Sequence, residues 1–139
     1  MSEGLTPAVL IAKACRACES ARLLLAAGDI DGACNRAYYA MFDAARAALF
    51  GGPAAIPPET VKTHSGLIAA FGLNLVKPGL VPLALGRAIN WAEDLRLMAD
   101  YRGDAIEPGD ARELVEQAEA FVADIQRIFP ALRDTHEPI

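Results

Sequence analysis

The sequence predicts an all-α fold, an up-and-down bundle of four long helices and one short helix. Hydrophobic residues make up 53% of the 139 residues and aromatic residues only 6%, so most of the apolar content is Ala and Leu. Both are strong helix formers. Apolar positions also recur at helical spacing, and prolines and glycines divide them into separate stretches. One domain suffices for this length, and we expect it to span residues 1–130, followed by a flexible tail, 131–139.

Capping residues and apolar spacing give the bounds of the predicted helices. Thr6 is suited to the N-cap of the first helix, and Asp29 or Asp31 to that of the second. Residues 51–60 contain three prolines, which remove backbone donors and favour extended backbone, so this segment is a predicted loop. The predicted helices are residues 7–27, 30–50, 61–73, 82–100 and 108–129.

Charge and hydropathy restrict the classes of partner. The formal net charge of −5 excludes broad, nonspecific attraction of nucleic acid but leaves room for arginines that hold a single phosphate. The chain begins without a basic segment and apolar run, and contains no stretch of roughly 18 apolar residues. We therefore expect a cytoplasmic protein that does not engage a membrane. The alanine-rich helices carry more apolar surface than one small domain covers, so we also expect a homodimer.

The three cysteines fall inside predicted helices. Cys15 and Cys18 have the two-residue gap of many zinc sites, and Cys34 and His64 could complete a tetrahedral set. No second cysteine pair accompanies them, however, and an odd number of cysteines within helices is typical of reduced thiols that pack as small apolar groups. We expect no metal and no cofactor.

Three segments, in order along the chain, have the pattern of a known family. They are Asn35-Arg-Ala-Tyr-Tyr-Ala-Met-Phe42, Lys62-Thr-His-Ser-Gly66 and Leu95-Arg-Leu-Met-Ala-Asp-Tyr101. Together they resemble the HEPN domain family, in its small stand-alone bacterial and archaeal branch. The resemblance implies a helical bundle that dimerises and is often encoded beside a minimal nucleotidyltransferase as a toxin and antitoxin pair. It also implies RNA as a substrate, since many members are metal-independent ribonucleases.

The ribonuclease members carry an Arg, then four to six other residues, then a His. Arg96 occupies the Arg position here, but Tyr101 stands where the His is expected. A tyrosine, with a pKa near 10, can donate a proton but is a poor base at neutral pH. His64 is the best substitute, and some tyrosines in related sites instead accept a nucleotidyl group from the partner enzyme.

The candidate site follows from the resemblance, and each part has an alternative role. The candidate catalytic residues are Arg96, Tyr101 and His64, and the candidate binding residues are Arg36, Tyr39, Asp100 and Lys62. Arg96 and Asp100 could instead form an ordinary exposed ion pair within one helix, worth about 0.2–0.5 kcal/mol. The tyrosines of the second helix could serve only in the core or a dimer contact, and His64 could simply bond to backbone at a helix start.

Three functions remain open from the sequence alone. The chain could be a toxin-like ribonuclease, with Arg96 holding the phosphate and His64 or Tyr101 transferring protons. It could be a catalytically silent module that binds a nucleotide through Arg36 and Arg96 and acts through a partner protein. It could also serve only as a dimerisation element.

Overall fold

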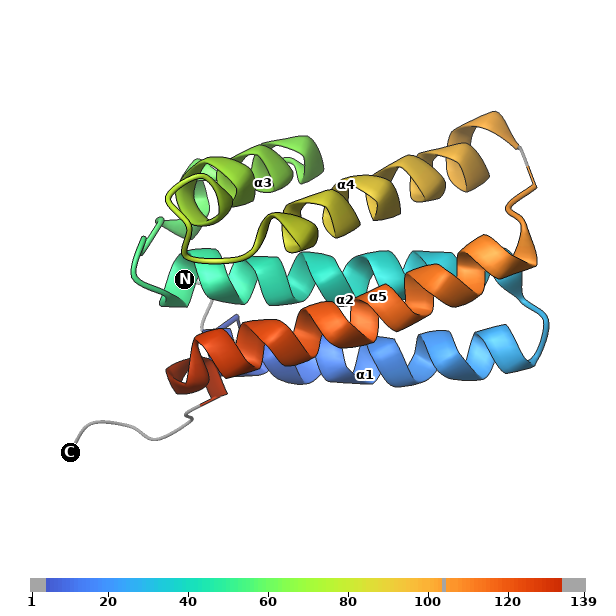
Figure 1. The fold of residues 1–139 in the computed structure, drawn as a ribbon, viewed down its shortest axis with the longest axis horizontal. Coiled ribbons are helices and arrows are strands. Elements are labelled where there is room, and N and C mark those ends of the chain that lie inside the picture. The colour runs from blue at the N-terminus through green and yellow to red at the C-terminus, as the bar shows by residue number, and fades with distance from the viewer. Residues whose placement is uncertain (1–4, 104, 134–139) are drawn as a thin grey trace.

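The protein folds into the predicted all-α, up-and-down bundle (Figure 1). The computed structural model describes residues 5–103 and 105–133, with only the backbone of Arg102. Within these ranges there is no strand, and no helix is long and apolar enough to cross a membrane. The helices are α1 (Pro7–Ala26), α2 (Ile30–Gly51), α3 (His64–Phe71), α4 (Leu83–Leu97) and α5 (Pro108–Ile128). Four long helices, α1, α2, α4 and α5, alternate in direction, and the short helix α3 packs against α2 and α4.

Side-chain caps set the starts of the first three helices. Thr6, Asp29 and Thr63 each accept a hydrogen bond from the backbone N–H three residues later, at 3.2, 2.9 and 2.9 Å. The prediction of Thr6 is confirmed, and Asp29, not Asp31, caps α2. The predicted start of the third helix near residue 61 is wrong, because the Thr63 cap makes His64 the first helical residue.

Two helices continue as wider π-helical turns that the sequence did not predict. Gly72–Val76 follows α3, and Met98–Arg102 follows α4. The second turn ends at Gly103, whose φ of 69° lies in the left-handed region that glycine adopts without strain. Such turns are frequent at functional sites. This one carries two of the candidate residues, Asp100 and Tyr101.

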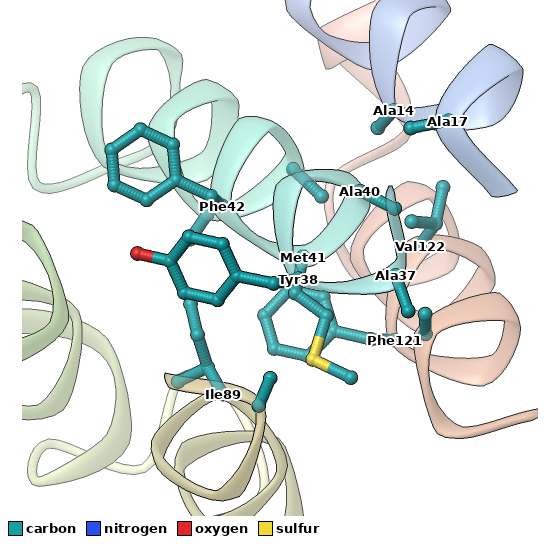
Figure 2. Packing of buried hydrophobic residues seen from close by; sticks show 14 of the residues in the cluster. Ala14, Ala17, Ala37, Tyr38, Ala40, Met41, Phe42, Ile89, Phe121 and Val122 are labelled. Atoms are coloured by element: carbon teal, nitrogen blue, oxygen red, sulfur yellow. The ribbon is translucent and has the colours of Figure 1, made fainter. Parts of the chain in front are cut away.

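Alanines let α1, α2 and α5 approach closely. Figure 2 shows Ala37 and Ala40 of α2 directed toward α5 and α1, whereas Tyr38 and Phe42 extend from another side of the same helix. Ala37, Ala40 and Tyr38 are fully buried. Because the methyl groups take little space, the larger side chains of the core come mainly from the neighbouring helices. They include Leu10, Phe71, Ile89, Leu114, Val115, Phe121 and Ile125.

The packed domain extends past the predicted boundary at residue 130. Pro130–Arg133 forms a 3-10 turn, in which Leu132 is only 3% exposed and packs onto the bundle. The predicted tail therefore begins with an ordered segment. The tail sequence is mostly polar, but the apolar side chain of Leu132 is buried and holds this segment against the bundle. The rest of that predicted tail, residues 134–139, lies outside the described residues.

Candidate functional site

Helix α2 presents three rings toward the start of α3. Tyr38, Tyr39 and Phe42 project from neighbouring positions of α2, because residues three and four apart share a helix face. His64 contacts all three, with ring centroids 5.6 Å from Tyr38, 5.7 Å from Tyr39 and 4.6 Å from Phe42. These four residues are called the aromatic cluster below. The Thr63 cap places His64 there, since it fixes where α3 begins.

A hydrogen bond orients the histidine of the cluster. The hydroxyl oxygen of Tyr38 lies 2.9 Å from Nδ1 of His64. Burial, together with the nearby carboxylate of Glu93, raises the pKa of Tyr38, so its hydroxyl keeps its proton at neutral pH. Whichever of the two groups donates, Nδ1 is engaged. The other ring nitrogen, Nε2, is therefore the one left for a ligand.

Arg96 reaches the cluster from α4. Its guanidinium carbon lies 4.8 Å from the centroid of the Tyr38 ring. Its Nε and Nη2 both lie 2.9 Å from Oε1 of Glu93, whereas Nη1 is 3.4 Å from Oδ2 of Asp100. Burial acts against the charged form, but the hydrogen bond that Arg96 donates to Glu93 and the attraction of that carboxylate prevail and raise the pKa of Arg96. The guanidinium is therefore a permanent cation.

Arg96 is too buried for the ordinary exposed ion pair with Asp100 that was the alternative role. Its side chain is only 11% exposed, its shorter ion pair is with Glu93 at 2.9 Å, and its guanidinium lies over the Tyr38 ring. The sequence analysis missed Glu93, although its spacing three residues before Arg96 is a signal for an intrahelical pair. Removing Arg96 would leave Glu93 partly buried without its partner, so the expected cost exceeds that of an exposed pair.

Two further arginines flank the cluster on α2. The guanidinium carbon of Arg36 lies 5.3 Å from the Tyr39 ring centroid, and that of Arg46 lies 5.2 Å from the Phe42 ring centroid. Arg46 also pairs with the buried Asp43 at 2.7 Å. The sequence analysis did not single out Arg46, although it lies four residues after Phe42 on the same helix face. A chain with net negative charge thus gathers three arginines around one group of rings.

The remaining candidate residues lie at the edge of this arrangement. Asp100 is 42% exposed and touches the cluster only through Arg96. Tyr101 is 75% exposed at the end of the π-helical turn, and Lys62 is exposed before α3. Neither takes part in the hydrogen bonds or ring contacts of the cluster. The fold therefore brings together Arg36, Tyr39, His64, Arg96 and Asp100, and leaves Tyr101 and Lys62 outside.

Two grooves border α4 on different sides. One, of about 350 Å³, lies between α3 and α4 and is lined by Ser65, Ile68, Ala69, Gly72, Asn90 and Glu93. The other, of about 480 Å³, lies between α4 and α5 and includes Trp91 and Ala84. Only the first shares a residue with the environment of Arg96, because Glu93 belongs to both.

The three cysteines belong to α1 and α2 and pack as thiols. Cys18 and Cys34 are buried, and Cys15 is half-buried. Burial raises the pKa of Cys18 to about 12 and that of Cys34 to about 11, so both thiols stay protonated at neutral pH. The described residues contain no group of three or more His, Cys, Asp or Glu side chains placed to hold a metal ion.

Comparison with known proteins gives the family. The sequence model of the HEPN domain matches residues 8–128. The chain belongs to the HEPN domain family. This confirms the resemblance carried by the three sequence segments, and it agrees with the helical bundle.

Three relatives of this HEPN protein cover much of its length. A UPF0332 protein from Gloeobacter violaceus is 34% identical over 115 residues, which is 81% of this chain and 87% of the relative. A UPF0332 protein from Thermotoga maritima is 31% identical over 117 residues, 83% of this chain and 84% of the relative. A protein from Methanocaldococcus jannaschii, named as a candidate toxin, is 36% identical over 92 residues, 66% of this chain and 65% of the relative.

Proposed function

We propose that this HEPN protein is the toxin-like component of a nucleotidyltransferase-linked toxin–antitoxin or defence system, and that it cleaves RNA without a metal ion at the aromatic cluster. Its similarity to the candidate toxin of Methanocaldococcus jannaschii supports the first part. One observation carries the second part: the Tyr38 hydroxyl holds Nδ1 of His64 at 2.9 Å, while the Arg96 guanidinium lies over the same Tyr38 ring.

The proposed reaction needs one base and one acid. The 2′-hydroxyl of the RNA attacks the adjacent phosphorus, so a bond from O2′ to phosphorus forms and the bond to the 5′ oxygen breaks. In this proposal Nδ1–H of His64 donates to the Tyr38 oxygen, so the unprotonated Nε2 takes the 2′ proton. A phenol is a weak base but an adequate donor, so Tyr101 gives a proton to the departing 5′ oxygen. The products are a 2′,3′-cyclic phosphate and a free 5′-hydroxyl.

Arg96 supplies the positive charge in this proposal. Two of its nitrogens stay bound to Glu93, which fixes the guanidinium plane against Tyr38. Among the described residues, the third, Nη1, has only the long 3.4 Å contact to the half-exposed Asp100. A phosphate oxygen could replace Asp100 at Nη1 and neutralise the charge that develops in the transition state.

A second copy and a partner enzyme complete the proposal. Tyr101 lies outside the cluster of its own chain, so its role as proton donor would be met in a homodimer with a composite site. The exposure of Tyr101 also suits acceptance of a nucleotidyl group from a minimal nucleotidyltransferase acting as antitoxin. Sedimentation at micromolar concentration tests the dimer, and a strictly monomeric species would contradict it.

A second candidate function is a catalytically silent module that binds a nucleotide and acts through its partner. The observation that favours it is the double engagement of Arg96 by Glu93 and Asp100, which partly neutralises the cation. In this alternative Arg36 and Arg96 hold the phosphates of the nucleotide. His64 then serves in packing.

An RNA cleavage assay in EDTA tests the main proposal. Wild-type protein should convert single-stranded RNA to fragments that end in 2′,3′-cyclic phosphate, and His64→Ala and Arg96→Ala should each lower the rate by about 100-fold or more. Arg127→Ala is the matched control, because Arg127 forms an exposed pair on α5 with Asp124 and should leave the rate unchanged. If wild type cleaves nothing but binds nucleotides, and Arg96→Ala abolishes that binding, the second candidate is correct.

A further inference from the structure

Small side chains keep a groove open between α3 and α4. Ser65 and Ala69 of α3 and Gly72 of the π-helical turn that follows it recur at helical spacing and line the groove, which has a volume of about 350 Å³. Ile68, only 8% exposed, contributes apolar surface to the same groove. A groove with small side chains and apolar surface leaves room for a planar ring, and recognition of RNA bases commonly combines such a surface with hydrogen bonds to the base edge.

The α4 wall of the groove presents hydrogen-bond acceptors. Asn90 uses its Nδ2 to donate to the carbonyl of Gly86 at 2.8 Å, so its Oδ1 remains for a ligand. Glu93 lies three residues later on the same face of α4, and its Oε1 receives both Nε and Nη2 of Arg96. Its second oxygen, Oε2, takes no part in the hydrogen bonds to Arg96, and the carboxylate also lies beside the Tyr38 hydroxyl. The wall therefore offers an amide oxygen and a carboxylate oxygen one helical turn apart.

We propose that this groove binds a guanine base. The inference rests on the proposed action on RNA and names the base that the same site recognises. Guanine presents two neighbouring donors, N1–H and the N2 amino group, to acceptors such as Glu93 and Asn90. Adenine and cytosine place a ring-nitrogen acceptor beside their amino group, and uracil has one N–H between two carbonyls. Each of these three bases would therefore bring an acceptor toward the Glu93 carboxylate, which is unfavourable.

The position of the groove links this base to the proposed chemistry. Glu93 lines the groove and also binds Arg96, so a nucleotide held in the groove lies beside the guanidinium. On the opposite wall, Ser65 directly follows His64 in the chain. The Arg96 cation and His64, the proposed general base, thus lie next to the two walls of one groove. Guanine binding would select which phosphate they meet.

The test compares four mononucleotides that differ only in the base. Titration of isotope-labelled protein with GMP, AMP, CMP and UMP should show GMP binding about 10-fold or more tightly than each of the others. The largest amide shifts should fall on Ser65, Gly72 and Asn90. The phosphate is common to all four ligands, so it cannot produce the difference.

Two matched variants locate the site. Ala69→Leu places a larger side chain in the groove at an exposed position, and should weaken GMP binding by about 10-fold. Ala84→Leu makes the same change at an exposed position in the groove between α4 and α5, and should leave GMP binding unchanged. Glu93→Gln should reduce the ratio of GMP to AMP affinity, a readout that weaker support of Arg96 alone would not change.

The outcomes separate this inference from the proposed function. Equal affinity for the four nucleotides, no measurable binding, or shifts confined to the other groove would each overturn the guanine site. Cleavage of RNA without regard to guanine would overturn it while leaving the ribonuclease proposal intact. GMP binding in the α3–α4 groove, without any RNA cleavage, would support the guanine site and remove the ribonuclease proposal.

Discussion

The two sides of α2 are built in contrasting ways. Toward α1 and α5 the helix carries buried alanines, among them Ala37 and Ala40 (Figure 2). Toward α3 and α4 it carries Tyr38 and Phe42, which meet a histidine and two arginines. One helix can serve both purposes because neighbouring residues point to different faces. The alanine side fixes the position of α2, and α2 in turn fixes the rings of the site.

The α3–α4 side is also less uniform than the alanine side. It contains both π-helical turns and the groove whose walls are kept apart by small residues. Close packing favours a single arrangement, whereas a groove and a half-exposed ion pair leave room for a ligand. The contrast suggests that the alanine side determines stability, and that the α3–α4 side gives up some packing for binding.

The largest expected effect lies where the two sides meet in the core. Phe121 of α5 is 1% exposed and stacks on Phe71 of α3, with ring centroids 5.5 Å apart. Phe121→Ala should lower the free energy of unfolding by about 3–5 kcal/mol, because it leaves a cavity between both sides. Denaturant unfolding measures this. Leu73→Ala, at a position 61% exposed, is the control and should cost less than about 0.5 kcal/mol.

This variant also tests how independent the two sides are. One cooperative transition at lower denaturant concentration would show that α3 unfolds together with the alanine side. Early loss of α3 alone, with α1, α2 and α5 retained, would show that the contrast extends to stability. A loss below about 1 kcal/mol would contradict the role of Phe121 as a core residue.

A smaller effect is expected from the hydrogen bond within the aromatic cluster. Tyr38→Phe keeps the buried ring but removes the hydroxyl that lies 2.9 Å from Nδ1 of His64. We expect the free energy of unfolding to fall by about 0.5–1.5 kcal/mol. The rate of RNA cleavage should also fall, because His64 is no longer oriented. Tyr39→Phe is the stability control, since the Tyr39 hydroxyl bonds to no other described residue. Unchanged cleavage in Tyr38→Phe would assign Tyr38 to packing alone.

Much of the fold could be predicted because its signals are local. The caps Thr6 and Asp29 and the helical spacing of apolar residues depend only on neighbours in the chain, and they give the bounds of α1 and α2 to within a residue or so. The π-helical turns could not be predicted in this way. Their hydrogen bonds skip one more residue, and no change in apolar spacing distinguishes them from an α-helix over five residues.

The candidate site was predictable only in part, for a related reason. The family segments indicated Arg96 and His64 separately, but nothing in their spacing indicated that both meet Tyr38. Tyr38 was expected to be a packing residue, and it is one, yet its hydroxyl also orients His64. Glu93 was not predicted, because the family segment extends from Arg96 toward Tyr101 and Glu93 precedes it. Contacts between distant segments depend on the register of packed helices, which local patterns do not specify.

The smallest effect on stability is expected at Asp100, which pairs with Nη1 of Arg96 and would compete there with a phosphate. Its Oδ2 lies 3.4 Å from Nη1 of Arg96, and its side chain is 42% exposed, so the pair contributes only a few tenths of a kcal/mol to stability. Asp100→Asn should therefore leave unfolding nearly unchanged. It should strengthen the binding of RNA or a nucleotide by about two- to five-fold, because it removes a negative charge beside the phosphate position and releases Nη1. The gain should shrink at high salt, since an exposed charge is screened.

Asp124→Asn makes the same change in net charge on α5, where Asp124 pairs with Arg127 at 3.3 Å, and should give little gain. Equal gains in both variants would point to net charge alone. A loss of binding in Asp100→Asn would mean that Asp100 positions Arg96 for the phosphate instead of competing with it.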